Sequence, residues 1–124
     1  MKRKGGFSIY NIPFKITGIK DSFEKEREWL KVTEGDDLIK ISICKEFPTP
    51  GYSLKVDKIA YEDNIYYIYL SITAPSPNAI LLQAITYKKI NIEINKKYIK
   101  APPPYIFKIK SMPAIIRSRS IKEE

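Results

Sequence analysis

Apolar and polar residues alternate along most of this chain, and the alternation predicts β-strands. The clearest runs are 65–73 and 89–95, where a period of two matches the spacing of side chains on one face of a strand. Residues 65–73 are apolar on both faces, which favours a central strand, whereas 89–95 is expected to be half-exposed. Weaker alternation predicts further strands at 14–20, 29–33, 38–43, 52–59 and 105–110.

Turn-forming residues separate these runs. The link 34–37 contains Gly35 and joins two strand-like segments, which predicts a hairpin. Asp63 and Asn64 tolerate left-handed backbone and predict a second tight turn. With turns at this spacing, we expect an all-β chain, a single antiparallel β-sandwich or open barrel of about six to eight strands.

Two segments are ambiguous. Residues 21–28 are either a short helix, which Asp21 and Glu24 would cap, or a charged edge strand. Residues 79–87 are apolar enough for two helical turns or for one buried strand. The prolines in 101–104 predict a stiff, extended linker.

With 124 residues, 44% of them hydrophobic, the chain fits one small domain. We expect the β domain over residues 7–110, a flexible basic leader at 1–6 and a weakly ordered tail at 111–124. The basic leader is not followed by the apolar run of a signal peptide, and no segment is long and apolar enough to span a membrane. As the sequence stands this predicts a cytoplasmic protein, or an exported one if a leader was removed.

The residue types for common catalysis are scarce. The chain contains no histidine, and its single cysteine, Cys44, cannot form an intramolecular disulfide. Cys44 lies in an alternating run and is expected to be a small, buried or half-buried strand residue. The chain has no histidine that could activate its thiol. The sequence therefore predicts a protein without catalytic residues, metal or cofactor.

The net charge of +8 is concentrated near the end of the chain. Residues 88–110 contain seven lysines and one acidic residue, Glu93. Such a segment can bind nucleic acid, with tyrosines such as Tyr105 stacking on bases, or its lysines can protect a sheet edge from aggregation. A half-exposed strand at 89–95 could also pair with a second copy. The nucleic-acid interpretation assigns the contact to Lys88, Lys89, Lys96, Lys97, Tyr98 and Lys100.

The stretch 47–53 has the strongest turn chemistry. Pro48 and Pro50 cannot donate to a sheet ladder, and Gly51 is free to adopt positive φ. Together with Thr49 and Tyr52, these three residues form the candidate site for binding a partner. Either Tyr52 packs into the core from a tight turn, or this loop presents its side chains to a partner.

Three polar residues farther along, Gln83, Thr86 and Tyr87, lie in an apolar setting. Buried polar groups need hydrogen-bond partners. We expect these three to anchor the Gly51 turn, a structural role.

Together, Thr49-Pro50-Gly51-Tyr52-Ser53, Ser76-Pro77 and Gln83-Ala84-Ile85-Thr86-Tyr87 resemble the PrcB C-terminal domain family over about residues 38–95. Pro50 stands where that family usually has a glycine, and Lys88 replaces a usual proline. The resemblance implies a non-catalytic accessory subunit that binds and stabilises a protease. The expected function is thus protein binding through 48–52, with nucleic-acid binding through 88–110 as the alternative.

Overall fold

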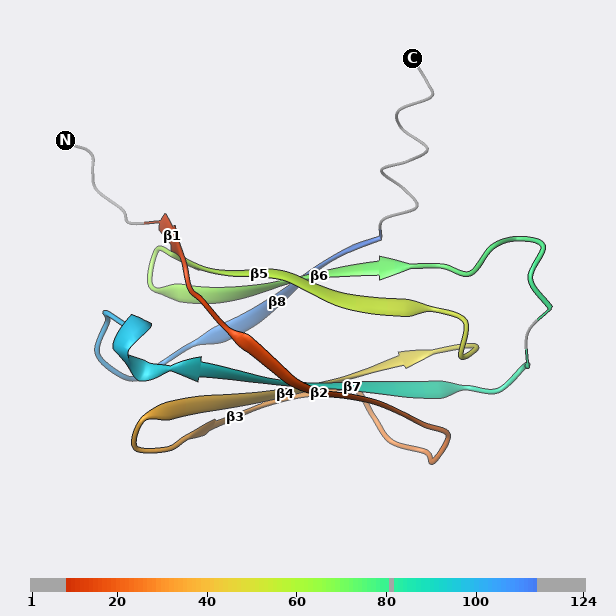
Figure 1. Cartoon of the computed structure of the whole chain (residues 1–124), viewed down its shortest axis with the longest axis horizontal. Coiled ribbons are helices and arrows are strands. Elements are labelled where there is room, and N and C mark those ends of the chain that lie inside the picture. Colours follow the sequence, from red (N-terminus) through yellow and green to blue (C-terminus); the bar gives the residue numbers. More distant parts are fainter. Residues whose placement is uncertain (1–8, 81, 114–124) are drawn as a thin grey trace, which may run out of the picture.

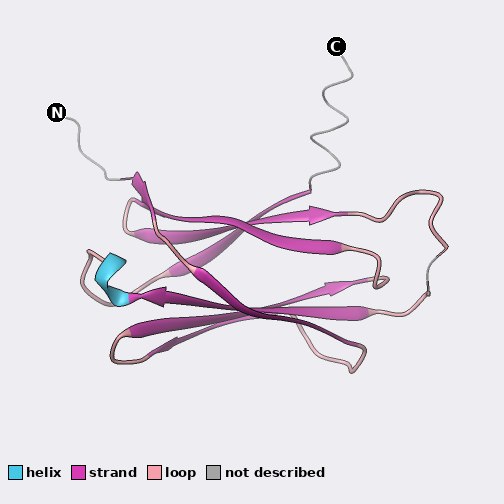
Figure 2. Ribbon diagram, viewed as in Figure 1, coloured by secondary structure: helices cyan, strands magenta, loops and turns pink. Residues whose placement is uncertain are grey.

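Two four-stranded sheets pack face to face in the computed structural model, which describes residues 9–80 and 82–113 (Figures 1 and 2). The upper sheet of Figure 1 has the order β1-β5-β6-β8, and the lower sheet has the order β2-β7-β4-β3. The upper strands are β1 (Ile9–Asn11), β5 (Ser53–Glu62), β6 (Ile65–Thr73) and β8 (Phe107–Pro113). The lower strands are β2 (Lys15–Ser22), β3 (Trp29–Glu34), β4 (Leu38–Phe47) and β7 (Thr86–Asn95). The prediction of an all-β sandwich is confirmed.

One pair of strands departs from the predicted antiparallel arrangement. β8 runs parallel to β6, with Tyr66 opposite Phe107. After β7 the chain forms a short 3-10 helix, η1 (Lys96–Tyr98), and returns to the upper sheet through residues 99–106. It therefore enters β8 at the same end at which β6 begins, and the two strands share a direction.

The core lies between the two sheets and follows the alternation of the sequence. Isoleucines at every second position of β4 and β7 point inward and are at most 1% exposed: Ile39, Ile41, Ile43, Ile90, Ile92 and Ile94. From the upper sheet, Ile59, Ile68 and Leu70 meet them. The expectation that 89–95 is a half-exposed strand is confirmed, because its buried isoleucines alternate with exposed or partly exposed residues. The strand is also central, because β7 has β2 on one side and β4 on the other. It offers no free edge for a second copy.

Local turn chemistry was predicted well at the hairpins and less well at Gly51. Asp63 and Asn64 adopt φ values of 54° and 74°, the left-handed turn expected between β5 and β6. The β3–β4 hairpin is closed by the Gly35 N–H, which donates to the Leu38 carbonyl at 2.8 Å. No glycine among the described residues has positive φ, so Gly51 lies in the turn but does not adopt the positive φ considered for it.

Both ambiguous segments are largely irregular. β2 extends to Ser22, and residues 23–28 then form neither the helix nor the edge strand considered for 21–28. The described part of 79–85 is irregular too, and β7 begins only at Thr86. β1 was not predicted as a strand.

β8 ends at Pro113, beyond the predicted boundary at residue 110. The leader predicted at 1–6 and the tail from residue 114 lie outside the described residues. Within the described part of the chain, no helix has the length and apolar character needed to cross a membrane.

Candidate functional site at the loop end

Three connections meet at one end of the sandwich, at the right of Figure 1. They are residues 23–28 after β2, 48–52 between β4 and β5, and 74–85 between β6 and β7. The strand register brings them together, because the last residue of β4, Phe47, lies opposite Thr86, the first residue of β7. We call these three connections the loop end.

The predicted partner-binding residues form the middle connection. Tyr52 is half-buried and its ring stacks on Phe47 with centroids 5.2 Å apart, as the structural interpretation of this turn expected. Thr49 is buried, and its hydroxyl donates to the Leu82 carbonyl at 3.0 Å. Pro48 is exposed, and Pro50 and Gly51 are half-buried. The turn is thus tied to the connection 74–85 by one side chain.

The predicted anchors act differently from the expectation. Thr86 and Tyr87 are buried, but the Thr86 hydroxyl donates to the Ala84 carbonyl at 3.0 Å, within its own loop. Gln83 is exposed. The tie to the 48–52 turn is the bond from Thr49 to a backbone carbonyl, and sequence patterns do not single out such an acceptor.

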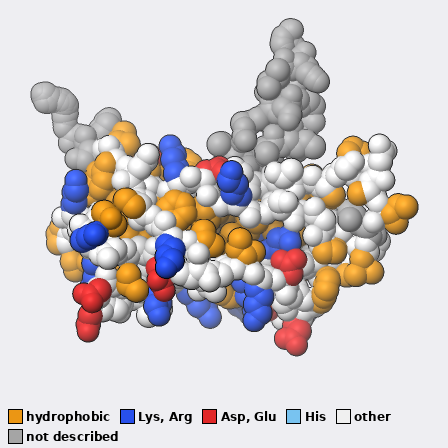
Figure 3. Space-filling model, viewed as in Figure 1, with side chains coloured by type: hydrophobic (Ala, Val, Ile, Leu, Met, Phe, Trp, Pro, Cys, Tyr) orange, Lys and Arg blue, Asp and Glu red, His pale blue; other side chains and the backbone are white. Residues whose placement is uncertain are grey.

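Sequence reasoning missed the most exposed apolar side chains of this end. Ile80 is 100% exposed, Leu82 62% and Ile85 52%, and Phe23 on the neighbouring connection is 57% exposed. Hydrophobic side chains project from this end in the space-filling view (Figure 3). The available signal was an apolar run beside two prolines, which was interpreted as a helix or a buried strand.

The lysines predicted for nucleic-acid binding are divided between the two ends of β7. Lys88 and Lys89 lie near the loop end, whereas Lys96 and Lys97 follow the other end of the strand. Tyr98 and Lys100 follow at that same far end. The structure therefore does not gather the six residues into one patch.

Three of these lysines are already paired with carboxylates. Lys88 is buried between the sheets, and its ammonium lies 2.9 and 3.0 Å from the two Asp21 oxygens. Lys89 pairs with Glu26, and this hydrogen bond lowers the pKa of Glu26 and raises the pKa of Lys89. Lys96 pairs with Glu34, which raises the pKa of Lys96.

Cys44 is fully buried on β4, as predicted. Burial, the largest cause, raises the pKa of its thiol. Because the thiolate is the reactive form, this environment disfavours nucleophilic chemistry at Cys44.

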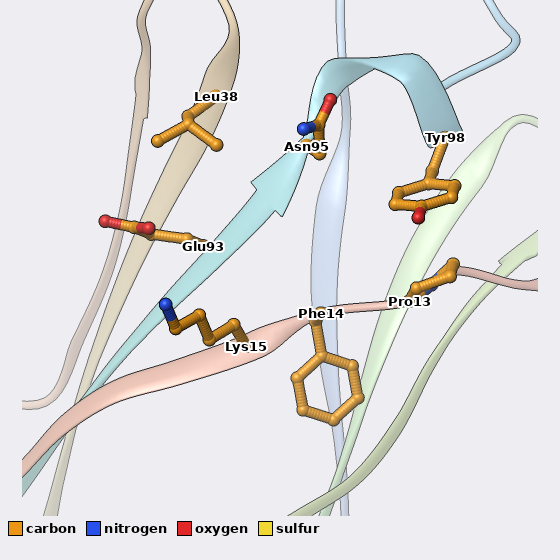
Figure 4. Close-up of a pocket in the computed structure, with 7 residues that line it drawn as sticks. All are labelled: Pro13, Phe14, Lys15, Leu38, Glu93, Asn95 and Tyr98. Atoms are coloured by element: carbon orange, nitrogen blue, oxygen red, sulfur yellow. The ribbon is translucent and has the colours of Figure 1, made fainter.

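A shallow cavity of about 370 Å³ opens at the other end of the lower sheet (Figure 4). Phe14, Leu38 and Tyr98 give it apolar walls, while Lys15 and Glu93 lie opposite each other on β2 and β7. Across residues 9–80 and 82–113, no group of three or more histidine, cysteine or acidic side chains is placed to hold a metal ion. The cavity thus combines apolar surface with one basic and one acidic side chain.

Comparison with known proteins supports the resemblance found in the sequence. The family model described as PrcB C-terminal matches residues 43–95. This segment runs from within β4 to the end of β7 and contains both the 48–52 turn and the connection 74–85. No curated protein and no solved structure matches the chain significantly.

Proposed function

We propose that this chain, PrcB-like over residues 43–95, is a non-catalytic accessory domain that binds a protein partner through its loop end. The observation that carries the proposal is the exposure of three aliphatic side chains, Ile80, Leu82 and Ile85, on one connection. Apolar side chains gathered on a protruding loop are typical of a surface that a partner covers.

The energetics of such a contact are favourable. Full burial of one exposed aliphatic side chain of this size contributes about 1.5–3 kcal/mol. Ile80 can gain this whole amount, and Leu82 and Ile85, which are 62% and 52% exposed, can gain part of it. The loop is also held at its base, because Thr49 donates to Leu82 and Thr86 donates to Ala84. A loop that is partly fixed before binding loses less conformational entropy when the complex forms.

The partner class follows from the resemblance, which implies association with a protease complex. The matched segment includes two of the three connections of the loop end. We therefore expect the partner to be a protease subunit with an apolar depression that accepts the connection 74–85.

The geometry supports protein binding over the nucleic-acid alternative. Beyond the paired lysines, Lys97 lies over the Tyr98 ring at 5.1 Å and Lys100 over the Tyr10 ring at 4.9 Å. An ammonium group above a ring occupies the face on which a base would stack.

The proposal is tested by affinity capture from nuclease-treated extract of the source cells. The baits are the wild-type chain, the triple variant Ile80→Ser/Leu82→Ser/Ile85→Ser, and a control with Lys97→Ser. A protein captured by the wild type and the control, but lost from the triple variant, is then purified and its affinity measured with each bait. We expect the triple variant to bind at least about tenfold more weakly.

Equal affinity for the wild type and the triple variant would contradict the proposal. The alternative is measured in parallel with single-stranded DNA at low salt. Tight, steeply salt-dependent binding that Lys97→Ser weakens would instead favour the nucleic-acid interpretation.

A further inference from the structure

The upper sheet is incomplete along one of its edges. β1 pairs only with residues 60–62 of β5, and the Ile12 N–H adds a last hydrogen bond to the Ile59 carbonyl at 2.8 Å. The chain then crosses to the lower sheet, where it becomes β2 (Figure 1). Residues 53–58 of β5 are therefore left without a strand on that side, within the part of the chain that the structure describes.

The lower sheet shows the consequence of this missing strand. On β2, Ile16 and Ile19 lie opposite Ile92 and Ile90 and thus share the inward face. The two β7 residues are 1% exposed, whereas Ile16 is 37% and Ile19 63% exposed. We call the free edge 53–58 of β5, together with Ile16 and Ile19, the open flank.

The open flank is continuous with a surface depression. A hollow of about 350 Å³ lies where the crossover meets β5, lined by Pro13, Phe14, Asp57 and Lys58 among others. Hydrophobic side chains are visible along this side of the molecule, between the two sheets (Figure 3). The position that a longer β1 would occupy thus has the apolar side chains of β2 below it and unpaired backbone groups of β5 beside it.

We propose that the open flank binds an extended segment of a partner protein, which adds to the upper sheet as a strand beside β5. Its backbone would pair with the free edge of β5. Alternate side chains of the added strand would be apolar and would cover Ile16 and Ile19. This surface is separate from the loop end, so the inference goes beyond the proposed function.

The outward side chains of the added strand are expected to be acidic. Lys55 and Lys58 point away from the core on β5, beside the position of the added strand, and cross-strand neighbours of opposite charge are favourable. The Lys58 ammonium lies over the Tyr69 ring at 4.6 Å. Asp57, the acidic residue between them, already accepts a hydrogen bond from the Ser71 hydroxyl.

The same lysines argue against a second copy of this chain as the occupant. Pairing two β5 edges would place Lys55 and Lys58 of one copy beside those of the other, and like charges in such positions are destabilising. The β-bulge between Val56 and Lys58 adds local twist, which limits the added strand to a few residues.

The probe is a soluble seven-residue peptide, capped at both ends, with alternating valine and glutamate. A matched peptide with lysine in place of glutamate and a third with N-methylated backbone at alternate residues serve as controls. Backbone amide shifts of the wild-type chain are followed by NMR during titration. We expect the acidic peptide to shift β5 and β2 resonances with a dissociation constant below about 1 mM, and both controls to bind at least about fivefold more weakly.

Variants of the chain identify the surface. Ile19→Ser should weaken binding of the acidic peptide by about fivefold or more, and Lys55→Glu should reverse the preference between acidic and basic peptides. Ile85→Ser, at the loop end, should leave binding unchanged, which keeps this test separate from the proposed function. Equal binding of all three peptides, no binding at millimolar concentration, or dimerisation that Ile19→Ser abolishes would each overturn the inference.

Discussion

A fully exposed isoleucine at one end of the sandwich contrasts with a fully buried tyrosine at the other. At the loop end, Ile80 is fully exposed. At the other end, which we call the tyrosine end, Tyr66 is 1% exposed and its ring centroid lies 4.7 Å from that of Tyr61 and 5.0 Å from that of Phe107. The comparison indicates that the tyrosine end stabilises the fold, whereas the loop end leaves apolar surface available to a partner.

The tyrosine end uses its rings more than its hydroxyl groups. The buried hydroxyls of Tyr10 and Tyr66 have no hydrogen-bond partner of normal geometry among the described residues. Burial, the largest cause, raises the pKa of Tyr66 to about 12 and also raises the pKa of Tyr10. Both hydroxyls therefore stay protonated at neutral pH, and packing dominates their contribution.

The largest expected difference between the two ends is in the cost of removing a side chain. Tyr66→Ala should lower the free energy of unfolding by about 3–5 kcal/mol, because it removes a buried ring from an aromatic cluster. Ile80→Ala should change it by less than about 0.5 kcal/mol, because the side chain is fully exposed. Urea denaturation measures both. Similar losses for the two variants would contradict the comparison.

If Tyr66→Ala does not fold, Tyr66→Phe keeps the test decisive. This change retains the ring and removes a hydroxyl without a partner, so the stability should be unchanged or slightly higher. A loss above about 1 kcal/mol would show that the hydroxyl is bound in the folded state.

A smaller difference between the two ends is expected in the stability lost when an ion pair is removed. Near the loop end, the Lys88 side chain is 11% exposed and Asp21 43% exposed. Asp21→Asn leaves a buried ammonium without its countercharge, and we expect a loss of about 1–2 kcal/mol. At the other end, Glu34→Gln removes the more exposed pair with Lys96 and should cost less than Asp21→Asn does. Equal losses would mean that burial of Lys88 does not matter.

The tie between the two connections of the loop end is expected to contribute less. Thr49→Val removes the hydroxyl that donates to the Leu82 carbonyl while keeping the size of the side chain. The expected loss is about 0.5–1.5 kcal/mol, the usual range for one hydrogen bond. Thr33→Val, on the exposed edge strand β3, is the matched control and should have almost no effect. Indistinguishable unfolding midpoints would show that the tie is not needed.

The smallest expected effect is the loss of stability at low pH when Glu26 is protonated. The folded-state pKa of Glu26 is lowered from 4.5, mainly by its hydrogen bond with Lys89. The stability from this interaction is therefore present above about pH 4.5 and is lost as the pH falls through the lowered value. Wild type and Glu26→Gln should differ in urea midpoint at about pH 7 and converge in strong acid. A difference in urea midpoint that increases as the pH falls would contradict this prediction.

Local sequence signals predicted the elements that depend on neighbouring residues. The Asp63–Asn64 turn and the hairpin at Gly35 follow from backbone preferences that a few residues decide. The inward isoleucines of β4 and β7 follow from alternation alone. These features are fixed by contacts near in sequence or by the faces of a strand.

Features that depend on distant parts of the chain were not predictable in this way. The parallel pairing of β8 with β6 depends on where residues 99–106 return, and Asp21 meets Lys88 across 67 positions of sequence. The central position of β7 likewise depends on which strands flank it. At the candidate site, the turn at 48–52 was predicted, but the exposure of Ile80 was not, because an apolar run alone does not show whether a partner strand will cover it.

Hydrogen exchange of the chain alone and bound to the captured partner tests the division between the two ends most directly. In the free chain we expect slow exchange in the β5–β6 hairpin of the tyrosine end and fast exchange in the described residues of 74–85. On binding, protection should increase in 48–52 and 74–85 and stay unchanged around Tyr66. Increased protection confined to the tyrosine end, with none at the loop end, would contradict the account.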